Sequence, residues 1–231
     1  MKISFVIPSK DSACWLAHAV QSCLQQTHKD IEVIVVNDGS KDSTADYLSW
    51  QATKDARVRV LTNDVPQGRS AARNAGNDLA SGEVICVLDA DDVATPQRAA
   101  LMAEKFKAGA EFVYGSAWVI DAVGRKLGDL QADVWDPKKA LETKKNRIVH
   151  STVAYSKEFS KNKYQVGRIS DLGLDDWELE LRAHFLGVKL DFVPQVLCAY
   201  RQLSSAITAT RDEKEVEICK AAVLESFKCL T

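Results

Sequence analysis

The sequence predicts an α/β protein whose mostly parallel sheet is covered by helices on both faces. Short apolar runs alternate, along the first half of the chain, with stretches in which apolar residues recur at helical spacing. The runs are apolar at nearly every position, as in strands buried on both faces. Several runs end in a group of polar residues, at the place where parallel α/β sheets bind their ligands.

The strands and helices of this first half alternate regularly. Trp15, Ala19 and Cys23 share one face of the first helix, and Ser43 begins the second with capping chemistry. Thr95 and Pro96 supply an N-cap and a first-turn proline for the fourth helix of this half. We expect strands at 3–8, 31–38, 58–61 and 84–88, and helices at 15–25, 43–50, 70–79 and 97–108.

The second half of the chain is less regular and predicts a smaller, irregular part of the same single domain, 1–231. A hairpin over 112–128 turns at Gly124. The other expected elements are helices at 136–147, 175–185 and 211–230, and strands at 189–192 and 196–200.

Composition excludes several classes of protein. The chain has 231 residues, 46% of them hydrophobic and 27% charged, which suits one sizeable core. A formal charge of -2 favours neither nucleic acid nor a membrane as an obligatory partner. The six cysteines form no CxxC, so a zinc site or disulfide framework is not expected. The first apolar run is too short for a signal or membrane segment, which predicts a cytoplasmic protein whose membrane contact, if any, is peripheral.

The acidic run DADD follows the fourth expected strand and points to a divalent cation. Asp89, Asp91 and Asp92 place like charges at the end of a buried strand, which is unfavourable without a positive partner. Mg²⁺ and Mn²⁺ combine one or two protein carboxylates with phosphate oxygens. The alternative is a solvated loop with a capping aspartate, but Thr95 fills the cap position and leaves the aspartates without a local structural role.

Two further groups lie at the expected ligand-binding edge. Asp38 ends the second strand, where its carboxylate suits a base N–H or a ribose hydroxyl, although the residues around it also suit a simple turn. Arg69, with Gly68, begins a helix and could bind a diphosphate, or be an ordinary exposed arginine. Neither GxGxxG nor a P-loop motif follows any strand, so phosphate would be bound by other means.

The ordered segments ISFVIPSKDSACWLAHAVQSCLQQT, IEVIVVNDGSKDST, QGRSAARNAG, GEVICVLDADD, HSTVAYS and LDDWELELRA resemble the family 2 glycosyltransferases, across roughly 2–205. The resemblance implies a GT-A fold (Rossmann-like) and an inverting enzyme that uses nucleotide-activated sugars, with UDP-sugar as the default donor and Mn²⁺ or Mg²⁺ as cofactor. It implies a donor half at 1–110, an acceptor half at 111–205 and a terminal helix at 206–231. The oligomeric state stays open.

The resemblance also implies roles for particular residues. The nucleoside contacts fall on Pro8, Ser9, Asp11, Asp38 and Arg69. The family's DXD motif falls on 89–91, with Asp91 binding the metal directly and Asp89 through water or ribose. The catalytic base falls on Asp176.

Three departures from the family pattern stand out. Ser9-Lys10 replaces the common Tyr-Asn, Leu203 stands where relatives often carry histidine, and Asp175 replaces the usual glutamate before the base.

The expected reaction is displacement of a nucleoside diphosphate by an acceptor hydroxyl. One carboxylate suffices to take the hydroxyl proton, and Asp176 is the candidate, with Asp175 as its rival; both could instead only complement a helix N-terminus. The candidates for contact with the acceptor are His150, Asp175 and Trp177, and Trp177 could stack on a sugar or belong to the core. Competing functions are a sugar-nucleotidyltransferase, an inactive nucleotide-binding or interaction domain of the same fold, and a glycosidase.

The charge distribution predicts an anionic acceptor. Residues 138–168 carry nine basic side chains, Lys138, Lys139, Lys144, Lys145, Arg147, Lys157, Lys161, Lys163 and Arg168, against the acidic Glu142 and Glu158. Such a segment could attract a phospholipid-linked glycan, a charged glycan or nucleic acid, or it could be only a solvated surface.

Overall fold

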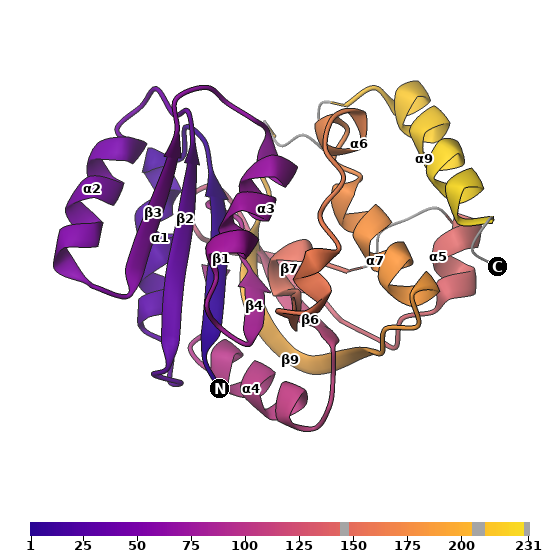
Figure 1. Ribbon diagram of the computed structural model, residues 1–231, viewed down its shortest axis with the longest axis horizontal. Helices are drawn as coiled ribbons and strands as arrows, with labels where there is room; N and C mark the ends of the chain where they lie inside the picture. The colour runs from indigo at the N-terminus through magenta and orange to yellow at the C-terminus, as the bar shows by residue number, and fades with distance from the viewer. Residues whose placement is uncertain (144–147, 205–210, 229–231) are drawn as a thin grey trace.

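The structure, a computed structural model, describes residues 1–143, 148–204 and 211–228. Within this part of the chain, nine strands form one sheet in the order β3-β2-β1-β4-β8-β6-β9-β5, with β7 paired to β6 (Figure 1). The strands are β1 Ile3–Ser9, β2 Ile31–Asp38, β3 Val58–Asn63, β4 Val84–Val87, β5 Val93–Ala94, β6 Phe112–Ile120, β7 Lys126–Leu130, β8 Ala154–Ser156 and β9 Leu190–Arg201.

Helices cover both faces of the sheet, as the sequence predicts. Side chains of α1, α2 and α4 pack with Ile3, Phe5 and Ile7 in one core cluster, whereas α3 and α7 pack with Val6 in the other. The helices are α1 Ala13–Leu24, α2 Thr44–Lys54, α3 Arg69–Leu79, α4 Arg98–Lys107, α5 Pro137–Thr143, α6 Arg168–Asp171, α7 Asp175–Phe185 and α9 Glu213–Lys228, with short 3₁₀ turns η1 His150–Thr152 and η2 Phe159–Lys161.

The parallel arrangement is confined to two parts of the sheet. β3, β2, β1 and β4 are parallel neighbours, as are β6 and β9, while β8, β7 and β5 pair antiparallel. The carboxyl ends of β1, β2 and β4 therefore meet at one edge, which confirms the predicted ligand-binding edge of the sheet. Gly76 brings α3 close to this sheet, since a Cβ there would lie 2.5 Å from Val6.

Most expected elements are confirmed within a few residues. Besides the differences that follow, the strand β8 and the short helix α6 were not expected. Two expected strands form one long strand, β9, whose pairing with β6 shifts register around Gly115–Ala117. The two-residue strand β5 was not expected. The expected helix over 136–147 is described only as α5, because residues 144–147 lie outside the described part.

The expected role of Thr95 as a helix cap is wrong. Helix α4 begins at Arg98, and the Thr95 hydroxyl donates to the carbonyl of Val196. The DADD run does have a structural role, since Asp92 accepts the Arg201 N–H at 2.7 Å. One of the three carboxylates therefore holds β9 rather than a ligand.

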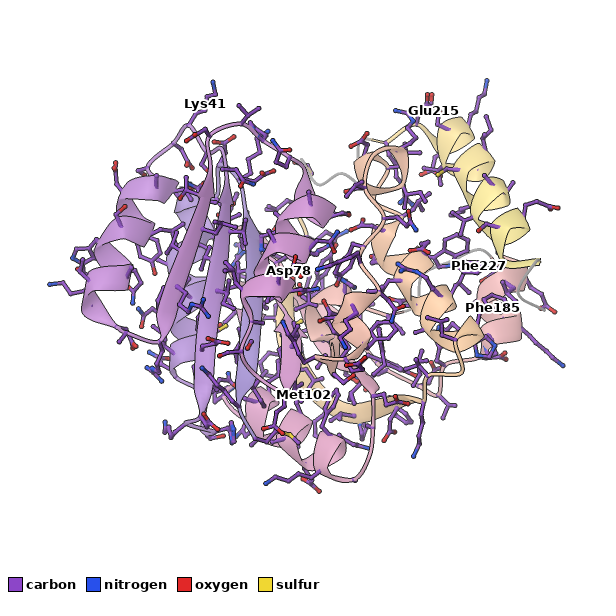
Figure 2. All side chains as sticks on the ribbon, viewed as in Figure 1. Lys41, Asp78, Met102, Phe185, Glu215 and Phe227 are labelled. Carbon is purple, nitrogen blue, oxygen red and sulfur yellow. The ribbon has the colours of Figure 1, made fainter. Side chains whose placement is uncertain are left out.

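The C-terminal helix α9 packs on α7. The rings of Phe185 and Phe227 stack with centroids 4.8 Å apart (Figure 2). Val223 and Trp177 belong to the same cluster. In the described ranges, we find no helix with the length and apolar character that crossing a membrane requires.

A buried carboxylate ties β1, β2 and the α3–β4 connection together at the opposite end of the sheet. Glu32 accepts hydrogen bonds from the Ser4 hydroxyl at 2.6 Å and from the Ser81 N–H at 2.7 Å. Lys2 and Arg59 each place a cationic nitrogen 3.3 Å from it. Burial opposes ionisation, but the hydrogen bonds outweigh it and lower the pKa of Glu32 to about 2.

Replacing Glu32 with glutamine should lower the free energy of unfolding by about 1–3 kcal/mol at pH 7, because an amide cannot accept these hydrogen bonds on both sides. The folded-state pKa lies below the unfolded value of 4.5. The advantage of the wild type should therefore be complete above pH 4.5 and fade as the pH falls toward 2. Denaturant unfolding across this range measures it, with exposed Glu83→Gln as control. Equal stability of Glu32→Gln and the wild type at pH 7 would contradict this account.

Candidate active site

The carboxyl ends of β1, β2 and β4 open into a cleft of about 710 Å³. Loops from both halves of the chain form its walls, and Arg69 at the start of α3 faces it. The expected site residues that line it are Pro8, Ser9, Asp11, Asp38, Arg69, Asp89, Asp91, His150 and Asp176. Lys10 and Leu203, at two positions that depart from the family pattern, line it as well.

A buried hydroxyl without a partner in the described ranges borders the cleft at the end of β1. Ser9, the last residue of β1, is buried, and its hydroxyl makes no hydrogen bond within the described structure. Buried hydroxyls almost always have a partner. The Ser9 hydroxyl is therefore suited to a ligand that enters this side of the cleft.

Asp38 and Asp11 hold the loops that form this side. The Asp38 carboxylate accepts the N–H groups of Gln67 and Gly68, each at 2.8 Å, and so fixes the approach to α3. Asp11 accepts the Lys41 N–H at 2.7 Å and adopts a φ of +47°, which is uncommon outside glycine. Both carboxylates border the cleft, and both also have a clear structural role.

The acidic loop after β4 carries three aspartates in different environments. Although burial opposes ionisation, Arg73 holds the pKa of Asp89 below its usual value, and the two side chains pair at 2.6 Å. Burial and the nearby charge of Asp89 raise the pKa of Asp91 to about 6. Burial, followed by the charge of Asp91, raises the pKa of Asp92 well above its usual value. Asp91 is thus a carboxylate at the cleft whose ionised form is disfavoured by burial and by Asp89.

The residues present fit a magnesium- or manganese-type ion. Asp89 and Asp91 offer hard oxygen donors, which these ions prefer. No three histidine, cysteine, aspartate or glutamate side chains converge as a metal cage within the ranges that the structure describes. A cation here would therefore take further ligands from water or from a bound diphosphate.

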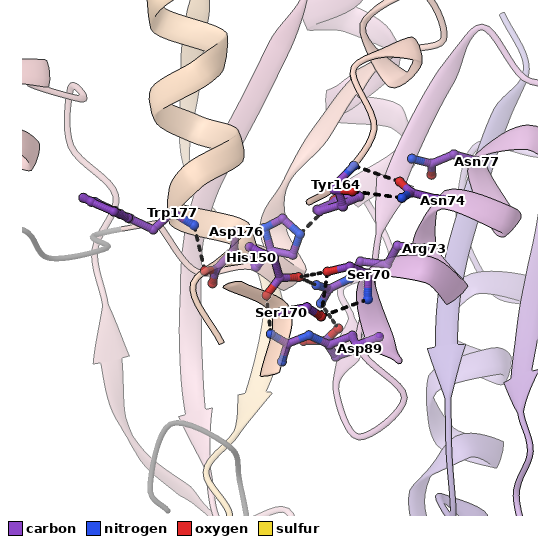
Figure 3. Close-up of polar contacts among 12 residues, drawn as sticks. Ser70, Arg73, Asn74, Asn77, Asp89, His150, Tyr164, Ser170, Asp176 and Trp177 are labelled. Carbon is purple, nitrogen blue, oxygen red and sulfur yellow. Dashed lines mark hydrogen bonds and ion pairs between the residues drawn. The ribbon is translucent and has the colours of Figure 1, made fainter. Parts of the chain in front are cut away.

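Asp175 and Asp176 begin α7 and have different surroundings; Figure 3 shows Asp176 beside Trp177. Asp175 is fully buried and binds Arg69 at 2.5 Å and Arg73 at 2.8 Å. Asp176 lines the cleft, and its carboxylate accepts the N–H of Trp177. Burial and the charge of Asp175 raise the pKa of Asp176. Of the two expected bases, only Asp176 is accessible to a substrate.

The structure gives Asp175 and Trp177 no contact with the cleft, so neither is suited to bind the acceptor. Trp177 is 2% exposed and packs with Leu181 and Phe227 in a core cluster, away from His150 and Arg73 (Figure 3). The core alternative for Trp177 is the correct one.

His150 does border the cleft; its Nε2 pairs with the Tyr164 hydroxyl at 2.9 Å, and its Nδ1 has no partner among the described residues. Burial, then the charge of Arg73, lowers the pKa of His150 to about 3, so the ring is neutral.

The structure scatters the described members of the basic segment. Lys161 pairs with Glu158, Lys163 with Asp78 and Arg168 with Glu215. Lys157 donates to the carbonyl of Asn77. None of the described lysines and arginines of 138–168 lines the cleft. Lys144, Lys145 and Arg147 lie outside the described residues. The anionic acceptor stays a prediction without support from this geometry.

Arg73 contacts two of the expected site residues and was not itself predicted from the sequence, nor were Tyr200 and Arg201, which line the cleft. Arg73 lies in the middle of α3, where the segment SAARNAG gives no indication that one arginine contacts two distant aspartates. Its spacing of four from Arg69 places both on one helix face. This spacing was the feature of the sequence that could have indicated a role for Arg73 at the site.

Comparison with known proteins identifies the family of this chain. A family model described as Glycosyl transferase family 2 matches residues 4–163. The chain belongs to glycosyltransferase family 2. Succinoglycan biosynthesis protein ExoO of Rhizobium meliloti is 37% identical over 126 residues, which cover 54% of this chain and 36% of ExoO. The chain spans about a third of the length of several curated relatives that it matches, ExoO among them.

Solved structures show the fold of this family 2 chain. TarS 1–349 of S. aureus in complex with UDP-GlcNAc has a TM-score of 0.76 at 16% identity, covering 96% of this chain and 66% of that one. The mannosyltransferase PcManGT of Pyrobaculum calidifontis, in complex with GDP-Man and Mn²⁺, has a TM-score of 0.64 at 17% identity, covering 96% and 61%. The predicted GT-A-like α/β fold is confirmed.

Proposed function

We propose that this chain is an inverting glycosyltransferase that transfers a sugar from a nucleoside diphosphate donor to an acceptor hydroxyl. One observation carries the proposal: a single cleft gathers the expected nucleoside-binding residues, the acidic pair Asp89 and Asp91, and the half-buried carboxylate of Asp176. A donor, its leaving group and a base must all meet in one place for this reaction. The family membership supports the same reaction.

The donor side binds the nucleotide. Pro8, Ser9, Asp11 and Asp38 border the nucleoside, and the Ser9 hydroxyl gains the hydrogen bond that it lacks. UDP is the nucleotide that we propose first, since TarS binds UDP-GlcNAc. GDP is the second, since PcManGT binds GDP-Man.

A divalent cation, Mn²⁺ or Mg²⁺, is held by Asp91 and Asp89. When bound, it offsets the negative charge that develops on the departing diphosphate. The local charge supports this assignment. Five carboxyl groups, Asp89, Asp91, Asp92, Asp175 and Asp176, lie among three guanidinium groups, Arg69, Arg73 and Arg201. Burial and repulsion by neighbouring aspartates raise the pKa values of Asp91 and Asp92, and a cation bound beside them would favour their ionised forms.

Asp176 removes the proton of the attacking hydroxyl. A carboxylate in a partly dry site is a better base than one in water, and burial raises the pKa of Asp176 in that direction. Attack from the face opposite the diphosphate inverts the anomeric carbon. The neutral ring of His150 lies on the same cleft and is suited to contact a sugar hydroxyl.

Nucleotide binding is the first test, because it does not require knowledge of the acceptor. UDP, GDP, dTDP and CDP are each added with and without Mn²⁺, and the melting temperature is read. A nucleotide at about 100 times its Kd stabilises the fold by about 2.7 kcal/mol, a rise of about 5–10 °C for a domain of this size. We expect this rise for one nucleotide above the others, and only with the metal.

The competing functions are distinguished by giving the same protein a nucleoside triphosphate, a nucleotide-sugar and a simple glycoside, and by measuring the products. A sugar-nucleotidyltransferase would bind the nucleoside triphosphate and, when a sugar 1-phosphate is supplied, transfer the nucleotidyl group to it and release pyrophosphate. An inactive binding domain would show the thermal shift but cleave no nucleotide-sugar. A glycosidase would hydrolyse a glycoside without any nucleotide-dependent shift, and this last result would contradict the proposal.

A further inference from the structure

Arg73 connects the donor side of the cleft to the helix that carries the proposed base. Its NH2 donates to Asp89 at 2.6 Å, in the loop after β4 (Figure 3). Its NH1 donates to Asp175 at 2.8 Å, at the start of α7. Asp89 and Asp175 are 86 positions apart in the sequence, and one guanidinium spans both. It is 1% exposed.

The location of Arg73 leaves it little freedom. Its guanidinium lies 5.4 Å from the centre of the Tyr164 ring, and Asn74, the next residue, exchanges two hydrogen bonds with the backbone of Tyr164. Burial opposes the charge, but Asp89 and Asp175 hold the pKa of Arg73 above its usual value. A buried cation with two anionic partners and a fixed ring beneath it is a rigid link.

Asp175 is the point at which this link reaches α7. Besides Arg73, the Asp175 carboxylate accepts from the Ser70 hydroxyl at 3.0 Å and from Arg69. Three residues of one helix, α3, thus hold one carboxylate of another. Asp175 is fully buried and cannot touch a substrate, yet the following residue, Asp176, faces the cleft.

We propose that Arg73 is a positioning residue: by holding Asp89 and Asp175 in one geometry, it fixes the first turn of α7 so that Asp176 stands at a set distance from the donor. The inference rests on the proposed glycosyl transfer. It assigns Arg73 no contact with either substrate. The bidentate shape of the guanidinium is what the role requires, because a lysine ammonium is a point charge without a planar fork.

Arg73→Lys and Arg73→Met test this inference by separating charge from shape. The activity measured is release of nucleoside diphosphate from UDP-GlcNAc, UDP-glucose and GDP-mannose, with water in place of the acceptor. If Arg73 positions the base, both variants should lower kcat by at least about tenfold, because a small misplacement of a base is costly. The donor KM should change by less than about threefold in Arg73→Lys. A purely electrostatic role would leave Arg73→Lys near the wild type and overturn the inference.

A second variant, Asp175→Asn, changes the partner of Arg73 on α7. Asp175→Asn keeps the Arg73–Asp89 pair but weakens the connection to α7. Because Arg73 and Asp175 act as one unit, the loss of kcat in Arg73→Lys with Asp175→Asn should be close to that of the worse single variant. Independent, multiplying losses would overturn the inference.

The control is Arg182→Met, which breaks a different ion pair of α7, with Glu178 at 2.8 Å, outside the cleft. It should lower the melting temperature but leave kcat unchanged. A fall in kcat equal to that of the Arg73 variants would mean that any damage to α7 has the same effect, and would also overturn the inference. If the wild type itself cleaves none of the donors, the proposed function fails instead.

Discussion

Replacing Asp176 with asparagine should lower the rate of sugar transfer at least about 100-fold and leave nucleotide binding nearly unchanged. The amide keeps the shape of the side chain and can still accept the N–H of Trp177, but it cannot take up a proton. Removal of a general base typically costs a factor of 10² to 10⁴, i.e. about 3–5 kcal/mol of transition-state stabilisation. Initial rates of nucleoside diphosphate release, together with the thermal shift by UDP and Mn²⁺, measure the two effects on the same protein.

Glu178→Gln is the control for this prediction. Glu178 lies two positions further along α7 and binds Arg182, so its replacement weakens the same helix without changing the cleft. It should lose stability and keep its turnover. Normal turnover in Asp176→Asn would remove the base assignment, because Asp175 is fully buried and cannot replace it.

Replacing Asp91 with asparagine should remove the metal-dependent part of nucleotide binding. Loss of a residue that only orients a metal ligand costs 10- to 100-fold in metal affinity, so loss of a direct ligand should cost at least about tenfold. Without metal, the variant should melt no lower than the wild type, because the amide removes the repulsion between Asp89 and Asp91. Titration of UDP at several Mn²⁺ concentrations, by calorimetry, measures this.

Asp46→Asn is the matched control, since Asp46 is an exposed aspartate in the first turn of α2 and does not line the cleft. It should bind UDP with the metal dependence of the wild type. Unchanged Mn²⁺ dependence in a folded Asp91→Asn protein would show that the cation, if one binds, is held elsewhere.

The parallel core and its ligand-binding edge could be predicted because they depend on local patterns. Runs such as IEVIVVND are apolar at almost every position, and β2 has the predicted bounds, Ile31–Asp38. Once these strands are parallel, the residues after them must meet at one edge. Asp38, Asp89 and Asp91 accordingly line the same cleft.

The errors concern side chains whose partners are far away in the sequence. Nothing near Asp92 indicates that it holds the N–H of Arg201, 109 positions later. Thr95 looks like a helix cap because its own neighbours suit one, but its hydroxyl bonds β9 instead. Trp177 follows the proposed base directly, yet the helical turn places its ring on the core side. Local chemistry cannot distinguish these outcomes, because tertiary packing decides them.

Proton NMR of donor cleavage tests the central claim most directly. An α-linked donor such as UDP-GlcNAc, UDP-glucose or GDP-mannose is incubated with the protein and Mg²⁺, and the free sugar is observed before its anomers equilibrate. Displacement of the diphosphate by water activated at Asp176 predicts that the β-anomer appears first, together with the nucleoside diphosphate, for the donor whose nucleotide gives the largest thermal shift. Appearance of the α-anomer first, or a bound nucleotide-sugar that is never cleaved, would contradict the account.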